Sequence, residues 1–346
     1  MASAKRILMV AALEHKPHKM FIDQTVKLGK GFIRLGHDVR YFSYSNALKE
    51  LSPFKSRTIG AYFYKNKVDD LLAAETKNYQ PDIICLSFVR VLDAITIEKI
   101  RRAAPNAVLI GGDGDLWPQL RPGRIAAAKK LDIFTASNNG ESLQTYRDAS
   151  VPKCVFMPNM CDPDTDYRYD VEPKWKTDIL WTGLIIHDPK RYPGEDMRYE
   201  LVSRLAKMPN CAVYGCCGRP KIGGINYLYA ISGARIGLSI NGDNNVQLYH
   251  SDRLTHYLSC GTFALAKRVP DTDLLFKGGL HLRYFDTADE FFELAKWYLG
   301  HEAERKKIAD AGMNWVHEHF NSVRIAGYML DLIEKGTYDA PWLSSR

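Results

Sequence analysis

Short apolar segments alternate with helical patterns along the first half of the chain. Each apolar segment is hydrophobic at nearly every position, as expected for a strand that helices cover on both faces. The expected strands are Arg6–Leu13, Val39–Tyr44, Pro81–Val89, Ala107–Gly112 and Leu131–Ser137. The helical patterns between them span Phe21–Leu35, Val68–Glu75, Thr96–Ala104 and Pro122–Lys130. This alternation predicts a parallel, doubly wound α/β sheet.

A segment without periodicity, Pro158–Pro173, is rich in Pro and Asp and is typical of a linker. The alternation then resumes, with expected strands Asp178–Ile185, Cys211–Gly215, Ala234–Asn241 and Thr262–Lys267. Helices are expected over Met197–Lys207, Gly224–Ser232, Ser251–Leu258, Asp289–Leu299, Glu302–His319 and Arg324–Glu334.

The predicted fold class is therefore α/β, with two Rossmann-like domains facing a cleft. Residues 1–172 would form the first domain and residues 173–323 the second. Residues 324–346 would form a helix and tail that pack back on the first domain. Ligands of such sheets bind at the carboxyl ends of the strands, so the site is expected in the cleft.

Composition narrows the class of protein. The 346 residues are 46% apolar and 25% charged, which is ordinary for a globular protein. No apolar run approaches the roughly 20 residues that span a bilayer, and the short apolar start is expected to be a first buried strand. The seven cysteines form no CxxC pair, which argues against a zinc site or a disulfide framework and indicates reduced thiols in the cytoplasm.

The net charge of +7 is a mild excess. It would suit an anionic substrate or peripheral contact with a membrane surface, and it is equally compatible with a solvated charged face. No basic stripe with interleaved aromatic residues is present, so no nucleic-acid partner is expected.

The segment His250–Lys267 contains the strongest candidate for ligand binding. It follows an expected strand, so its helix begins at the cleft, where exposed N–H groups and the helix dipole favour an anion. Ser251 could cap the helix, and Arg253 in the first turn could bind a phosphate through two hydrogen bonds. The alternative is an ordinary capped helix with a surface arginine.

This segment also carries a resemblance. Ser-x-Arg, a short helix ending in Cys260-Gly261, the segment Arg283–Asp286 and the following helices look like the nucleotide-binding domain of GT-B glycosyltransferases. The similarity is to the group-1-like branch that includes spore-maturation-type enzymes, and it extends from Asp132 to the C-terminus. It implies a nucleoside-diphosphate-sugar donor held mainly by the second domain.

The resemblance also implies residue roles. Ser251 and Arg253 would face the diphosphate. They belong to the polar first residues of the segment, which begin with His250. Gly183 would let the backbone approach the donor, Gly215 would lie near the base, and Asn241 would end a strand at the sugar. The usual glutamate pair for the ribose is absent, because His256 and Leu248 occupy those positions. His256 would therefore contact the ribose or a phosphate, or else pack inside the helix bundle.

Candidates for the chemistry lie in the first domain. Asp113 and Asp115 follow an expected strand within the sequence GGDGD. One of them could be a general base for the acceptor hydroxyl, the pair could hold Mn²⁺, or the segment is an acidic turn. His15 and His18 follow the first strand and could also act as a base or orient the acceptor, unless they are surface histidines.

The predicted function is that of a hexosyltransferase-type glycosyltransferase acting on a hydroxyl acceptor in a polysaccharide, lipid-linked glycan or small-molecule glycoside. The donor is a co-substrate, and neither a resident cofactor nor a metal is expected. The chain has no Walker loop, no nucleophile elbow and no GxGxxG after its first strand. A nucleotide-sugar epimerase or hydrolase, or a nucleic-acid base glycosyltransferase, are the alternatives.

Overall fold

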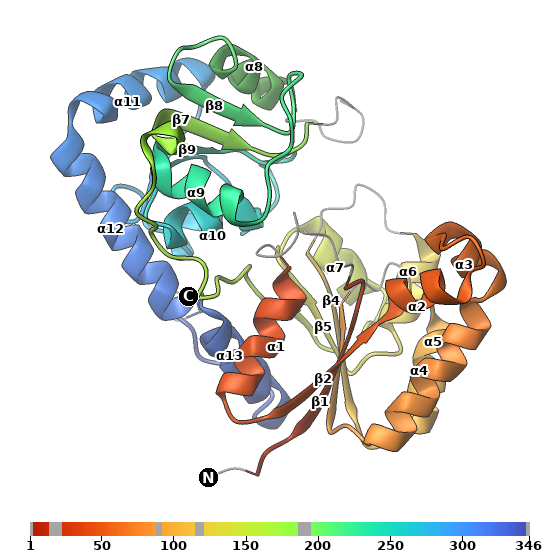
Figure 1. Ribbon diagram of the computed structural model, residues 1–346. Coiled ribbons are helices and arrows are strands. Elements are labelled where there is room, and N and C mark those ends of the chain that lie inside the picture. The colour runs from red at the N-terminus through yellow and green to blue at the C-terminus, as the bar shows by residue number, and fades with distance from the viewer. Residues whose placement is uncertain (1–2, 14–22, 88–91, 115–120, 186–194, 344–346) are drawn as a thin grey trace.

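The structure is a computed structural model that describes residues 3–13, 23–87, 92–114, 121–185 and 195–343. Two parallel sheets form two α/β domains (Figure 1). The first sheet has six strands in the order β2 (Asp38–Ser43), β1 (Arg6–Ala11), β3 (Ile83–Ser87), β4 (Val108–Asp113), β5 (Ile133–Ala136) and β6 (Cys154–Phe156). The second has five, in the order β11 (Arg283–Phe285), β10 (Phe263–Lys267), β9 (Ala234–Ser239), β7 (Thr177–Thr182) and β8 (Cys211–Tyr214). The prediction of two Rossmann-like domains is confirmed.

Strand β1 shows why the first sheet is apolar on both faces. Its residues Ile7 and Met9 belong to one core cluster and Leu8 and Val10 to another, and none of the four side chains is exposed. Helices cover both faces of this sheet (Figure 1). They are α1 (Gln24–Arg34), α2 (Tyr44–Leu51), α3 (Arg57–Phe63), α4 (Lys65–Tyr79), α5 (Ala94–Ala103), α6 (Pro122–Ala128) and α7 (Glu141–Asp148).

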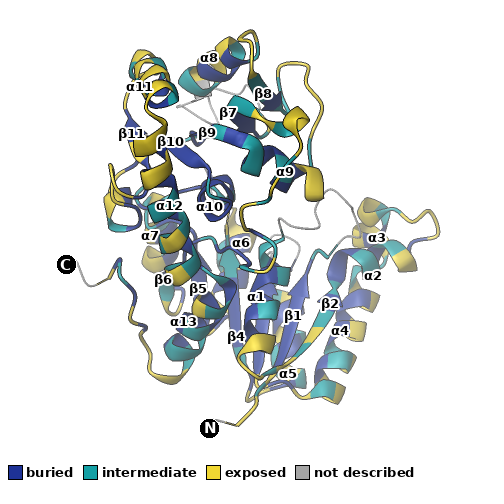
Figure 2. Cartoon of the chain, turned by 60° about the vertical axis from the view of Figure 1, so that its left-hand side comes forward, coloured by how far each residue is buried: buried dark blue, intermediate teal, exposed yellow. Residues whose placement is uncertain are grey.

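The second sheet is covered in the same way. Its helices are α8 (Glu195–Leu205), α9 (Ile225–Gly233), α10 (Asp252–Ser259), α11 (Ala288–Gly300) and α12 (Glu302–His319). All the residues of α10 except Asp252 are buried, which places this helix in the interior between the domains (Figure 2). Within the described residues, no helix is both long enough and apolar enough to cross a bilayer.

The last helix, α13 (Ser322–Glu334), crosses back to the first domain and lies beside α1 (Figure 1). Gly31 of α1 makes this approach close, since a Cβ there would lie 2.1 Å from the backbone oxygen of Ser322. After α13, the Tyr338 hydroxyl donates to the backbone oxygen of Phe156 over 2.7 Å. The C-terminal segment, which continues from α12 of the second domain, therefore packs on the first domain.

The segment predicted to be a linker connects the two domains and is packed into the structure. Asp162 and Asp166 are 2% and 0% exposed. Asp162 is paired with Lys30 and Arg34 of α1, and Cys161 forms a β-bridge with Asn321. The segment has irregular backbone, as its lack of periodicity predicts, and its buried carboxylates anchor that backbone to α1.

Candidate functional site

A cleft of about 920 Å³ lies at the carboxyl ends of the strands of the first sheet. Strands β3, β4 and β5 end in it, as expected for a parallel α/β sheet. The second domain contributes the residues just before and at the start of α10. Polar side chains that line the cleft include Asp113, Arg124, Ser251 and Asp252.

Asp113 ends β4 and lines the cleft, as the sequence predicts. Its carboxylate pairs with the guanidinium of Arg124 from α6, and the two side chains are only 12% and 8% exposed. Gly112, just before it, permits close contact with β5, because a Cβ there would lie 2.4 Å from the Thr135 hydroxyl. The other three chemical candidates, Asp115, His15 and His18, lie outside the described residues.

The start of α10 reaches the cleft through Ser251 and Asp252. Ser251 has the extended backbone of an N-cap residue, but its side chain accepts no hydrogen bond from the helix. The expectation that it caps α10 is therefore wrong. Its Oγ is buried and has no hydrogen-bond partner among the described residues. A helix start with free N–H groups and an unused hydroxyl is suited to an anion.

Arg253 is buried behind this helix start. Its guanidinium donates to the backbone oxygens of Thr182 (3.0 Å) and Ile240 (2.7 Å), at the ends of β7 and β9. It also lies over the indole of Trp181, with 4.1 Å between Cζ and the ring centroid. Within the described residues no carboxylate forms an ion pair with it. A buried cation without a counter-ion is costly, so an anionic ligand nearby would stabilise it.

Gly183 and Gly215 lie side by side at the ends of β7 and β8. Both have positive φ, +153° and +90°. A Cβ on Gly215 would lie 2.7 Å from the Gly183 oxygen, and a Cβ on Gly183 would lie 2.8 Å from Nη1 of Arg253. The two glycines thus keep the backbone close to the guanidinium. Neither glycine is among the described residues that line the cleft.

Asn241 follows β9, but its side chain holds the backbone and is not presented to the cleft. Its Oδ1 accepts from the Ser251 N–H (3.3 Å) and its Nδ2 donates to the Tyr249 oxygen (3.3 Å). The loop that it organises also contacts the first domain, where Asn139 N–H donates to the Gln247 oxygen over 2.9 Å. Asn241 therefore fixes the position from which α10 starts.

The two histidines proposed for donor binding are both in the interior. His250 is 2% exposed, it packs edge-on against Phe276, and burial lowers its pKa to about 4. His256 is fully buried, and burial followed by the charge of Lys27 lowers its pKa to about 3. The structure places neither ring at the cleft, and for His256 it supports the packed alternative.

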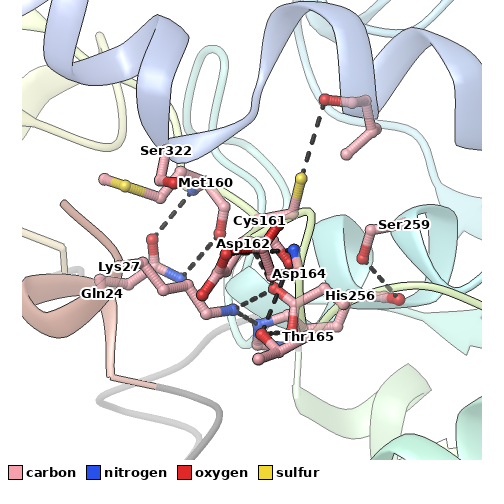
Figure 3. Close-up of polar contacts among 12 residues, drawn as sticks. Gln24, Lys27, Met160, Cys161, Asp162, Asp164, Thr165, His256, Ser259 and Ser322 are labelled. Atoms are coloured by element: carbon pink, nitrogen blue, oxygen red, sulfur yellow. Dashed lines mark hydrogen bonds and ion pairs between the residues drawn. The ribbon is translucent and has the colours of Figure 1, made fainter. Parts of the chain in front are cut away.

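His256 belongs to a buried network that sequence reasoning missed (Figure 3). Lys27 of α1 donates to Asp166 over 2.5 Å, and its Nζ lies 2.7 Å from Nε2 of His256. Since Lys27 can only donate, Nε2 is the acceptor and Nδ1 carries the proton toward the Tyr227 hydroxyl, 3.1 Å away. The network links the first domain, the interdomain segment and α10.

Arg124 and Lys27 were missed because their partners are distant in sequence or are not implied by a motif. For Arg124, one signal was present: it lies in the first turn of a short helix that starts with Arg121-Pro122-Gly123. That turn faces the ends of the strands. For Lys27, no local signal exists, since Asp166 is 139 residues away.

Part of the sequence is similar to a known protein family. Residues 196–331 match the model of a family described as glycosyl transferase-like. The matched residues include α10, α11 and α12. No curated protein matches the sequence.

Solved structures share the whole two-domain arrangement. A glycosyltransferase from Rickettsia africae ESF-5 aligns with a TM-score of 0.62 and 14% identity, over 99% of this chain and 100% of that one. The sucrose-phosphate synthase of Thermosynechococcus elongatus gives 0.64 and 14%, over 96% and 98%. Anabaena Alr3699/HepE in complex with UDP-glucose gives 0.59 and 10%, over 96% and 100%. At these identities the likeness establishes the shared GT-B fold.

Proposed function

We propose that the protein transfers a sugar from a nucleoside-diphosphate-sugar donor to a hydroxyl acceptor. The observation that carries this proposal is the start of α10. Ser251 lines the cleft with a buried, unused hydroxyl, and behind it Arg253 is buried with no carboxylate counter-ion among the described residues. A diphosphate would accept from the hydroxyl and the free N–H groups, and its charge would offset that of Arg253.

The comparisons support a nucleotide sugar as the donor. The glycosyl transferase-like match includes α10, and the Anabaena protein with the same fold has been solved with UDP-glucose. For the present chain, the diphosphate would lie at α10, the backbone at Gly183 would approach the donor and the base would lie near Gly215. Membership of the spore-maturation branch and hexosyl transfer are further parts of the proposal.

The first domain would bind the acceptor. The cleft continues from α10 to Asp113, so a hydroxyl bound over β4 would lie between the two. Asp113 would take the proton of that hydroxyl or orient it, with Arg124 holding the carboxylate in place. Asp115, His15 and His18 remain candidates for the same role.

We infer that the reaction needs no metal. In metal-dependent transferases a divalent cation offsets the charge of the leaving diphosphate. In this protein the α10 N-terminus and Arg253 would supply the positive charge at that place. A cytoplasmic location, peripheral to a membrane, fits this proposal, because nucleotide sugars are soluble donors and the acceptor can be carried by a lipid.

The sharpest test of the donor site is Ser251→Ala. Arg253→Ala would also release the strand ends that the guanidinium holds, whereas the Ser251 hydroxyl has no partner in the described part of the fold. A thermal-shift screen of UDP, GDP, ADP, CDP and TDP would first identify the base. Ser251→Ala should then weaken that diphosphate roughly tenfold, the loss of one hydrogen bond to a charged group, and leave the bare nucleoside unaffected. The result should be equal in EDTA and in Mn²⁺.

Ser52→Ala is the matched control. The Ser52 hydroxyl is also buried and has no hydrogen-bond partner in the part of the chain that the structure describes, but it lies in the first domain and does not line the cleft. Its loss should leave nucleotide affinity unchanged. Absence of any nucleotide-diphosphate binding would contradict the proposed function. Turnover of the nucleotide sugar that is independent of added acceptors would favour the epimerase or hydrolase alternative.

A further inference from the structure

The corner between α2 and α3 exposes large apolar side chains. Phe54, Tyr62 and Phe63 are 76%, 82% and 70% exposed, the highest values among the large hydrophobic residues that the structure describes. Leu51, at the end of α2, is also exposed. Figure 2 shows α3 at the outer edge of the molecule, mostly in the exposed colour. Grouped exposed aromatic residues of this kind mark an interaction surface.

The same corner is basic. Residues 44–67 contain five basic residues and a single acidic one, Glu50. The basic residues are Lys49, Lys55, Arg57, Lys65 and Lys67. Some of this charge is offset, since Lys55 pairs with Glu50 and Lys65 with both Asp69 and Asp93. The sum nevertheless attracts an anionic surface, and rings flanked by lysines are typical of segments that insert at a membrane interface.

Helix α3 joins this corner to the cleft. Arg57, Thr58 and Ala61 line the cleft on one side of the helix. Gly60 packs on α2, where a Cβ would lie 2.1 Å from the Leu48 oxygen. Tyr62 and Phe63 remain on the outer side, with their ring centroids 4.7 Å apart. One short helix therefore has the cleft on one side and the exposed rings on another.

We propose that the α2–α3 corner, residues Leu51–Lys67, docks on an anionic lipid bilayer and so presents the cleft to a lipid-linked hydroxyl acceptor. This inference rests on the proposed function for the acceptor, but the docking itself does not require it. A bilayer fits better than a nucleic acid. The exposed groups include Leu51 and two phenylalanines at a convex corner, whereas platforms for single strands lie in grooves that follow the backbone.

The test uses the full-length protein and sedimentation with vesicles. One set contains phosphatidylcholine alone, and the other has one-third of it replaced by phosphatidylglycerol. The protein should sediment with the anionic vesicles only. The triple variant Phe54→Ser/Tyr62→Ser/Phe63→Ser should bind at least about tenfold more weakly, because the apolar area that enters the interface is lost. Lys55→Gln and Lys67→Gln should each weaken binding roughly fivefold.

Matched controls lie on α11 in the other domain. Trp297→Ser removes a ring that is 44% exposed, and Lys296→Gln removes an exposed cation. Neither should change vesicle binding. All variants should keep the wild-type melting temperature and nucleotide affinity, since the three rings are exposed and do not line the cleft.

Three outcomes would overturn the docking proposal. The first is that the wild type does not bind vesicles, or that the ring and lysine substitutions weaken vesicle binding no more than the control substitutions on α11 do. The second is binding of duplex or single-stranded DNA that the ring substitutions abolish while vesicle binding persists. The third is a change from oligomer to monomer in the triple variant, measured by light scattering, which would make the corner a subunit interface. Nucleotide binding is measured separately, so each proposal can fail without the other.

Discussion

At the scale of single residues, Asp113 is the described carboxylate best placed for chemistry. Asp113→Asn keeps the shape and removes the basicity. If Asp113 is the general base of an inverting transfer, kcat should fall by about 10²–10⁴, while donor affinity stays nearly unchanged. Steady-state kinetics with the identified nucleotide sugar, together with nucleotide titration, would separate the two effects.

Asp132→Asn is the control for this experiment. Asp132 also pairs with an arginine, Arg101, but it precedes β5 and so lies at the opposite edge of the sheet. Its replacement should not alter kcat. Near-normal kcat in Asp113→Asn, with NMR showing an inverted product, would exclude Asp113 as the base and move the assignment to Asp115, His15 or His18.

The residues at the α10 start show what a local pattern can give. A strand followed by small polar residues and an arginine predicts that Ser251, Asp252 and Arg253 lie near the cleft. The prediction is possible because chain order determines which end of a parallel strand is followed by the start of a helix. The pattern could not give the partners. Arg253 binds the ends of two strands, and Asn241 holds a loop, because such contacts depend on how loops close in three dimensions.

At the scale of elements, the position of α10 depends on the Lys27–Asp166–His256 network, since Lys27 alone reaches both other side chains. Asp166 is fully buried and also accepts from the Asp162 N–H over 2.8 Å. Lys27→Met should therefore lower the free energy of unfolding by about 3–5 kcal/mol, because it leaves a buried carboxylate without its cation. Chemical denaturation would measure the change.

The double variant Lys27→Met/Asp166→Asn distinguishes this cause from a packing defect. With the carboxylate neutralised, much of the lost stability should return, so the two changes would not be additive. Lys30→Met is a milder control: Lys30 is 35% exposed, and Arg34 still pairs with Asp162. Additive losses in the double variant would contradict the network.

Element prediction succeeded where burial on both faces gives a continuous apolar run. All the expected strands are present, and helices such as α12 match in both bounds. It failed for α2, α3 and α7, where short helices at Ser, Pro and Gly positions lack a full apolar period, and for β6 and β11, which are only three residues long. Their conformation depends on packing at the sheet ends, and a short window of sequence does not contain that information.

At the scale of the whole molecule, the second domain and its junction with the first are built around histidines that must stay neutral. The pKa values of His250 and His281 are lowered to about 4 and that of His256 to about 3, in each case first by burial. His256 also faces the cation of Lys27, and His281 faces Lys277 and His319. Protonating any of them would place a charge in the interior, so the integrity of the cleft is linked to pH.

The expected pH dependence follows from the direction of these shifts. The unfolded chain binds protons at these histidines as the pH falls below about 6.5, whereas the folded protein resists protonation until about pH 4 or 3. The stabilisation is thus fully present above pH 6.5 and is lost as the pH falls from there. Each neutral histidine should contribute a loss of about 1.4 kcal/mol per pH unit in this window. The carboxylates with lowered pKa, Asp93 and Asp162, lose their contribution only below about pH 4.

Urea denaturation at several pH values between about 7.5 and 4.5 would measure this slope. His256→Gln should reduce it by about 1.4 kcal/mol per pH unit, because one of the proton-binding differences is removed. The substitution should also lower stability at neutral pH, since glutamine cannot reproduce both contacts to Lys27 and Tyr227. A wild-type stability that is flat between pH 7 and 5 would show that these rings become protonated inside the fold, and the neutral Lys27–His256 contact would then have to be abandoned.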